Sequence, residues 1–117
     1  MTRQASLTLH SQLAALVRNK PVTVTPDATL REAVQAMSEN RIGSVIVVEP
    51  IGSRPIGIFT LRDLLHKVAA KSCDLDQMVM SVMSGSGLLT LNWRSTIYQA
   101  ALMMARHGVH HVIVVDA

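Results

Sequence analysis

VTVTPDATLREAVQAMSENRIGSVIVVE, residues 22–49, has a second version further along the same chain. That version reads LTLNWRSTIYQAALMMARHGVHHVIVVD and occupies residues 89–116, at an offset of 67 (89 − 22) with no gap. Eight of the 28 aligned positions are identical, including the run VIVV at 45–48 and 112–115. An internal repeat of this kind predicts two copies of one supersecondary unit, and the rest of the fold prediction starts from it.

Each copy has the pattern of a strand, a helix and a second strand. Short strands are expected at 22–25 and 89–92. T-x-x-E and T-x-x-Q then fit capping boxes at the start of each helix. The run VIVV, apolar at every position, predicts a strand buried on both faces. The capping residues are Thr29 with Glu32 and Thr96 with Gln99, and the apolar helix stripes are Leu30, Ala33, Val34 and Met37, and Ile97, Ala100, Ala101 and Met104.

The first copy continues beyond its VIVV strand. The turn-rich loop EPIGSRP leads to a strand at 55–60, expected to be antiparallel to 45–48. A helix is expected at 61–71 with Leu61, Leu64, Leu65 and Val68 on one face, and another at 7–18, with Leu9, Leu13, Leu16 and Val17 apolar. The first unit is therefore β-α-β-β-α, whereas the second has only β-α-β.

Composition excludes several classes of protein. The 117 residues are 49% apolar and 16% charged, which argues against disorder. No apolar run approaches 18 residues, and the first residues lack the apolar stretch of a signal peptide. The single cysteine, Cys73, cannot form an internal disulfide, which fits the cytoplasm. The net charge is +3, but the basic residues are scattered, so no direct binding of nucleic acid is expected.

The order and doubling of these motifs resemble a tandem pair of CBS domains, or Bateman module, over residues 14–117. In the first copy the resemblance rests on KPVTVTPDATLREAVQAM, NRIGSVIVVE and GIFTLRDLL, the last fitting the family's Gly-h-h-Thr/Ser-x-x-Asp signature. In the second it rests on the chain from VMSGSG onward. The expected fold class is α/β, an α+β sandwich of small mixed sheets and helices in tandem CBS repeats.

The resemblance also predicts the domain organisation. An N-terminal extension is expected at 1–13, the first repeat at 14–71, a connector at 72–81 and the second repeat at 82–117. Because the first copy runs to about Lys71, the second should run to about residue 138 (71 + 67). We therefore expect the chain to be a piece of a longer one, with its second repeat incomplete and an apolar strand edge left exposed.

In function, the resemblance implies a regulatory module rather than an enzyme. Such pairs bind an adenosine-containing nucleotide (AMP, ADP, ATP or S-adenosylmethionine) between the repeats and control an attached effector domain. No cofactor is required and no membrane contact by this segment is expected, whereas a homodimer is expected through the CBS helices or the exposed strand edge. A ligand-free dimerisation or scaffold module stays open as the alternative, and no catalytic constellation of residues is present.

The candidate site centres on Thr60 and Asp63. Thr60 lies where a strand ends and a helix begins, a place where free amides favour a phosphate. The Asp63 carboxylate can accept hydrogen bonds from both hydroxyls of a ribose. The same spacing is also a capping box that only starts a helix, and both interpretations can hold together.

By resemblance, two apolar stretches before strands sandwich and read the base, and two histidines reach a phosphate across the cleft. A solvated turn is the alternative for the histidines, and plain core packing is the alternative for Val22 and Val45. A metal site at His107 and His111 is disfavoured because Gly108 interrupts the helix between them. The full set of candidate ligand-binding residues is Lys20, Pro21, Val22, Thr23, Ile42, Gly43, Ser44, Val45, Gly57, Ile58, Thr60, Asp63, His110 and His111.

Overall fold

Residues 8–15, 21–72, 74–84, 88–109 and 111–115 are described by the structure, a computed structural model. They belong to two compact units. The central unit spans Lys20–Leu88. The terminal unit joins the two ends of the chain, Met1–Asn19 and Leu89–Ala117.

A three-stranded sheet forms the middle of the central unit. Its strands are β1 (Thr23–Val24), β2 (Ser44–Val48) and β3 (Pro55–Thr60), in the order β1-β2-β3. β1 and β2 are parallel and are joined by helix α1 (Leu30–Asn40), whereas β2 and β3 are antiparallel. The expected β-α-β crossover and the expected hairpin are both confirmed.

Helix α1 begins at the expected capping box and buries the expected stripe. The Thr29 hydroxyl accepts a hydrogen bond from the Glu32 amide at 3.1 Å, and the Glu32 carboxylate accepts one from the Thr29 amide at 3.4 Å. Val34 is only half-buried. The core that α1 forms with the sheet, with the helical segment after β3 and with Val79 consists of Leu30, Ala33, Met37, Val45, Val47, Phe59, Val68 and Val79.

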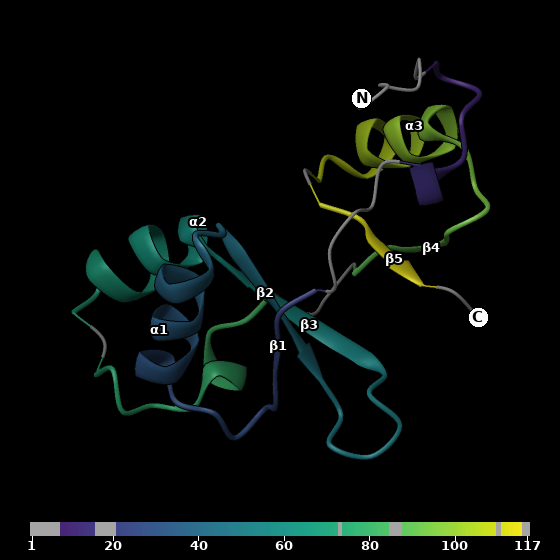
Figure 1. The fold of residues 1–117 in the computed structure, drawn as a ribbon. Helices are drawn as coiled ribbons and strands as arrows, with labels where there is room; N and C mark the ends of the chain where they lie inside the picture. Colours follow the sequence, from purple (N-terminus) through teal and green to yellow (C-terminus); the bar gives the residue numbers. More distant parts are fainter. Residues whose placement is uncertain (1–7, 16–20, 73, 85–87, 110, 116–117) are drawn as a thin grey trace, which may run out of the picture. The chain divides into compact units, whose positions relative to one another are not determined.

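The helical segment after β3 changes its geometry within one turn. Helix α2 (Leu61–Asp63) is α-helical for three residues, and the π-helix η2 (Leu64–Ala69) follows. Figure 1 shows this segment beside α1. The expected apolar face was wrong at two positions, because Leu61 and Leu65 are 52% and 63% exposed. The other two expected positions are confirmed in part, because Val68 is buried and Leu64 is half-buried, and the buried face also includes Asp63.

The terminal unit repeats the β-α-β arrangement. β4 (Thr90–Asn92) and β5 (Ile113–Val115) are parallel, and α3 (Ile97–His107) joins them (Figure 1). Thr23 pairs with Ile46 in the central sheet and Thr90 pairs with Ile113 here, so both partners shift by 67 residues (90 − 23 and 113 − 46). The repeat seen in the sequence is therefore preserved in the register of strand pairing.

The stripe of α3 is less buried than expected. Ala100 is buried, Ile97 and Met104 are half-buried and Ala101 is exposed. The sheet beneath α3 has two described strands, against three beneath α1, so it covers less of the helix. The second capping box is confirmed, because Gln99 and Thr96 exchange both hydrogen bonds. Within the described residues, no helix is long and apolar enough to span a membrane.

The helix expected at 7–18 is wrong for the part that the structure describes. Residues 8–12 form turns and a bridge, and only the 3₁₀ turn η1 (Leu13–Ala15) is helical. Besides two turn bonds of its own, the backbone of this segment bonds with the start of α3: the Ile97 amide donates to the Ser11 carbonyl at 2.9 Å, and the Leu13 amide to the Ser95 carbonyl at 2.7 Å. These long-range bonds replace the i to i−4 bonds that a helix needs.

The central unit has an equivalent set of long-range backbone bonds. Here the start of α1 bonds with residues 75–79, which precede the second repeat. The 3₁₀ turn η3 (Val79–Ser81) follows residues that bond with the start of α1. The Leu30 amide donates to the Gln77 carbonyl at 2.8 Å, and the Val79 amide to the Ala28 carbonyl at 2.7 Å. Each repeat is thus completed by the segment that precedes the other one. Residues 82–84, expected in the second repeat, pack on the central unit, while the repeat boundaries themselves stay predictions.

Candidate functional site

Thr60, the last residue of β3, and Asp63 form reciprocal hydrogen bonds. The Thr60 amide donates to Asp63 Oδ2 at 3.0 Å, and the Asp63 amide donates to Thr60 Oγ1 at 3.2 Å. The Thr60 hydroxyl lies 3.2 Å from the same Oδ2 atom. The capping-box interpretation is therefore confirmed. Thr60 caps a helical segment that continues from α2 into η2 without a break.

Asp63 is a buried carboxylate with an internal partner for its charge. It is 5% exposed, and Lys67 Nζ lies 3.0 Å from Oδ1. The Ser84 hydroxyl donates to the same oxygen at 3.2 Å. Burial of a carboxylate is tolerated when it is paired and hydrogen-bonded, and both conditions hold here. The side chain that resembles a ribose acceptor is therefore already fully bonded.

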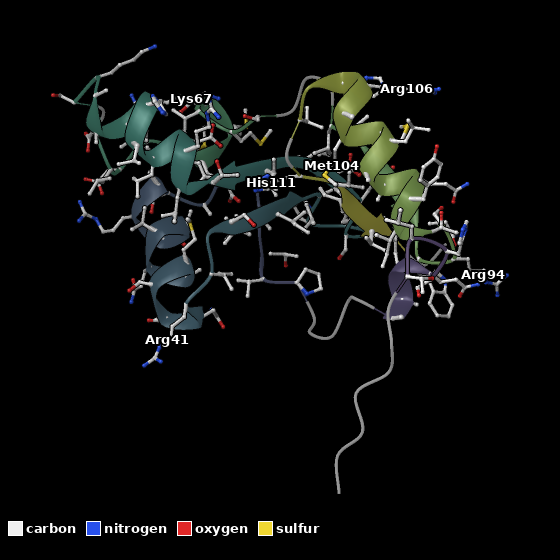
Figure 2. All side chains as sticks on the ribbon, turned by 90° about the horizontal axis from the view of Figure 1, so that it is seen from above. Arg41, Lys67, Arg94, Met104, Arg106 and His111 are labelled. Atoms are coloured by element: carbon white, nitrogen blue, oxygen red, sulfur yellow. The ribbon has the colours of Figure 1, made fainter. Side chains whose placement is uncertain are left out.

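Lys67 extends this cluster to the connecting segment. It lies on the helical segment after β3 (Figure 2) and donates to the Val82 carbonyl and to the Ser84 hydroxyl, each at 3.2 Å. Neither Lys67 nor Ser84 is among the residues that the sequence patterns indicated. The spacing of Asp63 and Lys67, four apart on a helix, was a usable signal for the first. Nothing in the local sequence indicates that Ser84, 21 residues from Asp63, joins them.

The candidate residues Gly57 and Ile58 also contact the connecting segment. Ile58 and Ser84 exchange both backbone hydrogen bonds at 2.9 Å, as in an antiparallel bridge. Met83 lies over Gly57 so closely that a β-carbon at 57 would overlap its sulfur. The edge of β3 that the resemblance assigns to a ligand is thus occupied by residues 82–84 in this structure.

The sheet brings most of the other central-unit candidates to the same end. Ser44 pairs with Thr60, because β2 begins where β3 ends. The Leu61 amide donates to the Gly43 carbonyl at 2.9 Å, and the Ile46 amide to the Val22 carbonyl at 3.1 Å. The exposed candidates in this group are Pro21, Thr23 and Gly43, and the half-buried ones are Val22, Ile42 and Ser44.

Val45 differs from its neighbours because it is fully buried in the core, as the core-packing interpretation holds. Lys20 and His110 lie outside the described residues. His111 is exposed just before β5 in the terminal unit (Figure 2). Among the described residues, no group of three or more His, Cys, Asp or Glu side chains could hold a metal ion.

A doubled β-α-β unit with a Thr-x-x-Asp turn after the hairpin defines a class of small α+β repeat modules. The family model for the CBS domain matches residues 13–70. A CBS-domain containing protein from Agrobacterium tumefaciens is 32% identical, with a TM-score of 0.75 over 88% of this chain and 82% of that one. The chain belongs to the CBS domain family.

Other relatives agree with this assignment. A CBS domain protein from Pyrobaculum aerophilum, solved in complex with AMP, is 28% identical with a TM-score of 0.82 over 91% of this chain and 79% of that one. The CBS domain-containing protein YhcV of Bacillus subtilis is 31% identical over 80% of this chain and 65% of its own length. The chain spans between half and two thirds of the length of the first curated relatives it matches.

Proposed function

We propose that this chain is a regulatory module that binds an adenosine-containing nucleotide and controls an attached effector domain. The observation that carries the proposal is the placement of Thr60 and Asp63 at the end of β3, beside the start of β2, in a CBS fold. The relative from Pyrobaculum aerophilum binds AMP, which supports this class of ligand. The chain itself does no chemistry on the nucleotide in this proposal.

In the proposed complex, the Asp63 carboxylate accepts hydrogen bonds from the ribose hydroxyls, and the Thr60 hydroxyl donates to a phosphate oxygen. The adenine ring lies against Pro21–Thr23 and Ile42–Ser44, where strand edges offer apolar surface and backbone groups. His110 and His111 donate to phosphate from the second repeat. Asp63 has to exchange at least one of its present partners for the ribose.

Isothermal titration with AMP, ATP and S-adenosylmethionine tests the proposal on the chain. Asp63→Asn keeps the size of the side chain but removes its charge and one acceptor, so we expect it to abolish the binding heat. Glu32→Gln is the matched control, because it makes the same kind of change in the capping box of α1. Absence of heat with all three ligands, or equal binding by Asp63→Asn, contradicts the proposal.

A ligand-free dimerisation or scaffold module is the second candidate. Two observations favour it: the Asp63 carboxylate has all its partners within the chain, and Leu61 and Leu65 expose apolar surface on one helical segment. Sedimentation equilibrium tests it with Leu65→Ser, which should weaken a dimer formed through this surface. Ile51→Ser is the control, because Ile51 is exposed at the β2–β3 turn, away from that segment. A wild-type chain that stays monomeric contradicts this candidate.

A further inference from the structure

Residues 82–84 are held to the central unit at three consecutive positions. The Val82 carbonyl accepts from Lys67 Nζ, the Met83 side chain packs on Gly57, and the Ser84 hydroxyl donates to Asp63. The Ser84 backbone also bonds with Ile58 in both directions. These residues are the last ones described before the chain continues toward the second repeat. The candidate ligand residue Asp63 therefore also fixes the connection between the repeats.

We propose that Asp63, Lys67 and Ser84 form a latch on this connecting segment, and that a nucleotide opens the latch when it takes over the Asp63 carboxylate. The ligand-opening step rests on the proposed function. Once the latch is open, fewer contacts hold residues 82–84 to the central unit. Nucleotide binding thereby loosens the segment that leads to the second repeat.

The number of hydrogen bonds that the Asp63 carboxylate can accept limits what it can bind. A carboxylate offers about four acceptor positions. Two are taken by the Thr60 amide and hydroxyl on Oδ2, and two by the Ser84 hydroxyl and Lys67 on Oδ1. A ribose brings two hydroxyl donors, so it cannot bind to Asp63 without displacing existing partners.

Ser84 is the partner that gives way in this proposal. Thr60 lies three residues from Asp63 and caps the same helical turn, and Lys67 neutralises the charge four residues away. The Ser84 hydroxyl is neutral and comes from a separate segment. Its bond to the carboxylate is charged on the acceptor side only, so it contributes less than the bond from Lys67, in which both groups carry charge. Unlike Thr60, Ser84 is also not held beside Asp63 by the same helical turn, so it is the easiest of the three to exchange. Loss of this bond leaves the segment held by the Lys67 bonds to Val82 and Ser84, the backbone bridge and Met83.

Hydrogen exchange on the ligand-free chain tests the latch without any nucleotide. We expect Ser84→Ala to raise the exchange rate of the amides at 84 and 58, which form the backbone bridge. Ser81→Ala is the matched control, since the Ser81 hydroxyl donates to the nearby Met78 carbonyl; this variant should leave both rates unchanged. Equal rates in Ser84→Ala and the wild type overturn the latch.

Titration with AMP tests the opening step. Removal of a competing donor should tighten AMP binding to Ser84→Ala by about 10- to 100-fold over the wild type, the factor that one hydrogen bond to a charged group is worth. Ser81→Ala should bind like the wild type. Equal or weaker binding by Ser84→Ala overturns the opening step while the proposed function stands. If the wild type binds no nucleotide, the proposed function and the opening step both fail, and hydrogen exchange still decides whether the latch exists.

Discussion

The Met83 side chain occupies the space into which a β-carbon of residue 57 would project, so Gly57 and Met83 are fitted to each other. A methyl group at 57 would lie 3.0 Å from Met83 Cγ and closer still to the sulfur. We expect Gly57→Ala to lower the free energy of unfolding by about 1–3 kcal/mol, the usual cost of overpacking. Urea denaturation followed by circular dichroism measures it.

Gly43→Ala is the control for this prediction. The same methyl group at 43 would lie 3.5 Å from Leu61 Cδ1, an ordinary van der Waals contact. We expect a change below about 0.5 kcal/mol there, within the range of unremarkable surface substitutions. A Gly43→Ala variant as unstable as Gly57→Ala would show that the cost does not come from Met83.

Arg41 and Gly108 end the two equivalent helices in the same left-handed conformation, with φ of 53° and 63°. This conformation costs a residue with a β-carbon about 1 kcal/mol or more, and glycine adopts it freely. We expect Arg41→Gly to raise the free energy of unfolding by about 0.5–1 kcal/mol. Gly108→Ala should lower it by a similar amount, and chemical denaturation of both variants checks the pair. Stabilisation by Gly108→Ala would contradict the argument.

The Thr96 hydroxyl satisfies the Gln99 amide at the start of α3. Thr96→Ala leaves this amide without its partner, so we expect a loss of about 1 kcal/mol in the stability of the terminal unit. Thr96→Ser keeps the hydroxyl and should lose much less. Nuclear magnetic resonance of backbone amides in α3 against urea measures the difference. An equal loss in both variants would assign the effect to the methyl group instead of the cap.

Leu13 is buried in the terminal unit, in the 3₁₀ turn η1, and Ala15 is exposed in the same turn. Leu13→Asp places a charge without a partner where the leucine packed, and we expect a loss of about 3–5 kcal/mol. Ala15→Asp adds the same charge at the surface and should be tolerated. Amide spectra distinguish the units: the signals of α3 should collapse in Leu13→Asp while those of α1 persist. Intact α3 signals would contradict the role given to the N-terminal segment.

The sequence predicted the parts of the fold that depend on local patterns. Both capping boxes, the VIVV strands and the β2–β3 hairpin are determined by residues close together in the chain, and all are confirmed. The helix expected at 7–18 was wrong because its backbone bonds with residues 93–98, and no local pattern shows such a partner. The face of Leu61 and Leu65 was wrong because the segment turns Asp63, Leu64 and Val68 toward the core instead.

For the candidate site, the sequence predicted the Thr60–Asp63 pair and its capping geometry. It did not predict that Asp63 would be buried and bonded to Lys67 and Ser84. Burial depends on the segment 82–84, which reaches the site only after the chain has passed through the rest of the unit. The assignment of the remaining candidates to a ligand stays a prediction.

Because each repeat is completed by the segment that precedes the other one, the two units cannot fold at the same stage of synthesis. Residues 11–14 bond with residues 93–97, so the terminal unit closes a loop of about 80 residues. The central unit lies wholly within that loop and can fold while the chain is still being synthesised. The segment 11–14, although made before the central unit, has to wait until α3 has left the ribosome. We therefore expect refolding in two kinetic phases, the central unit first, with the slower phase governed by this long closure.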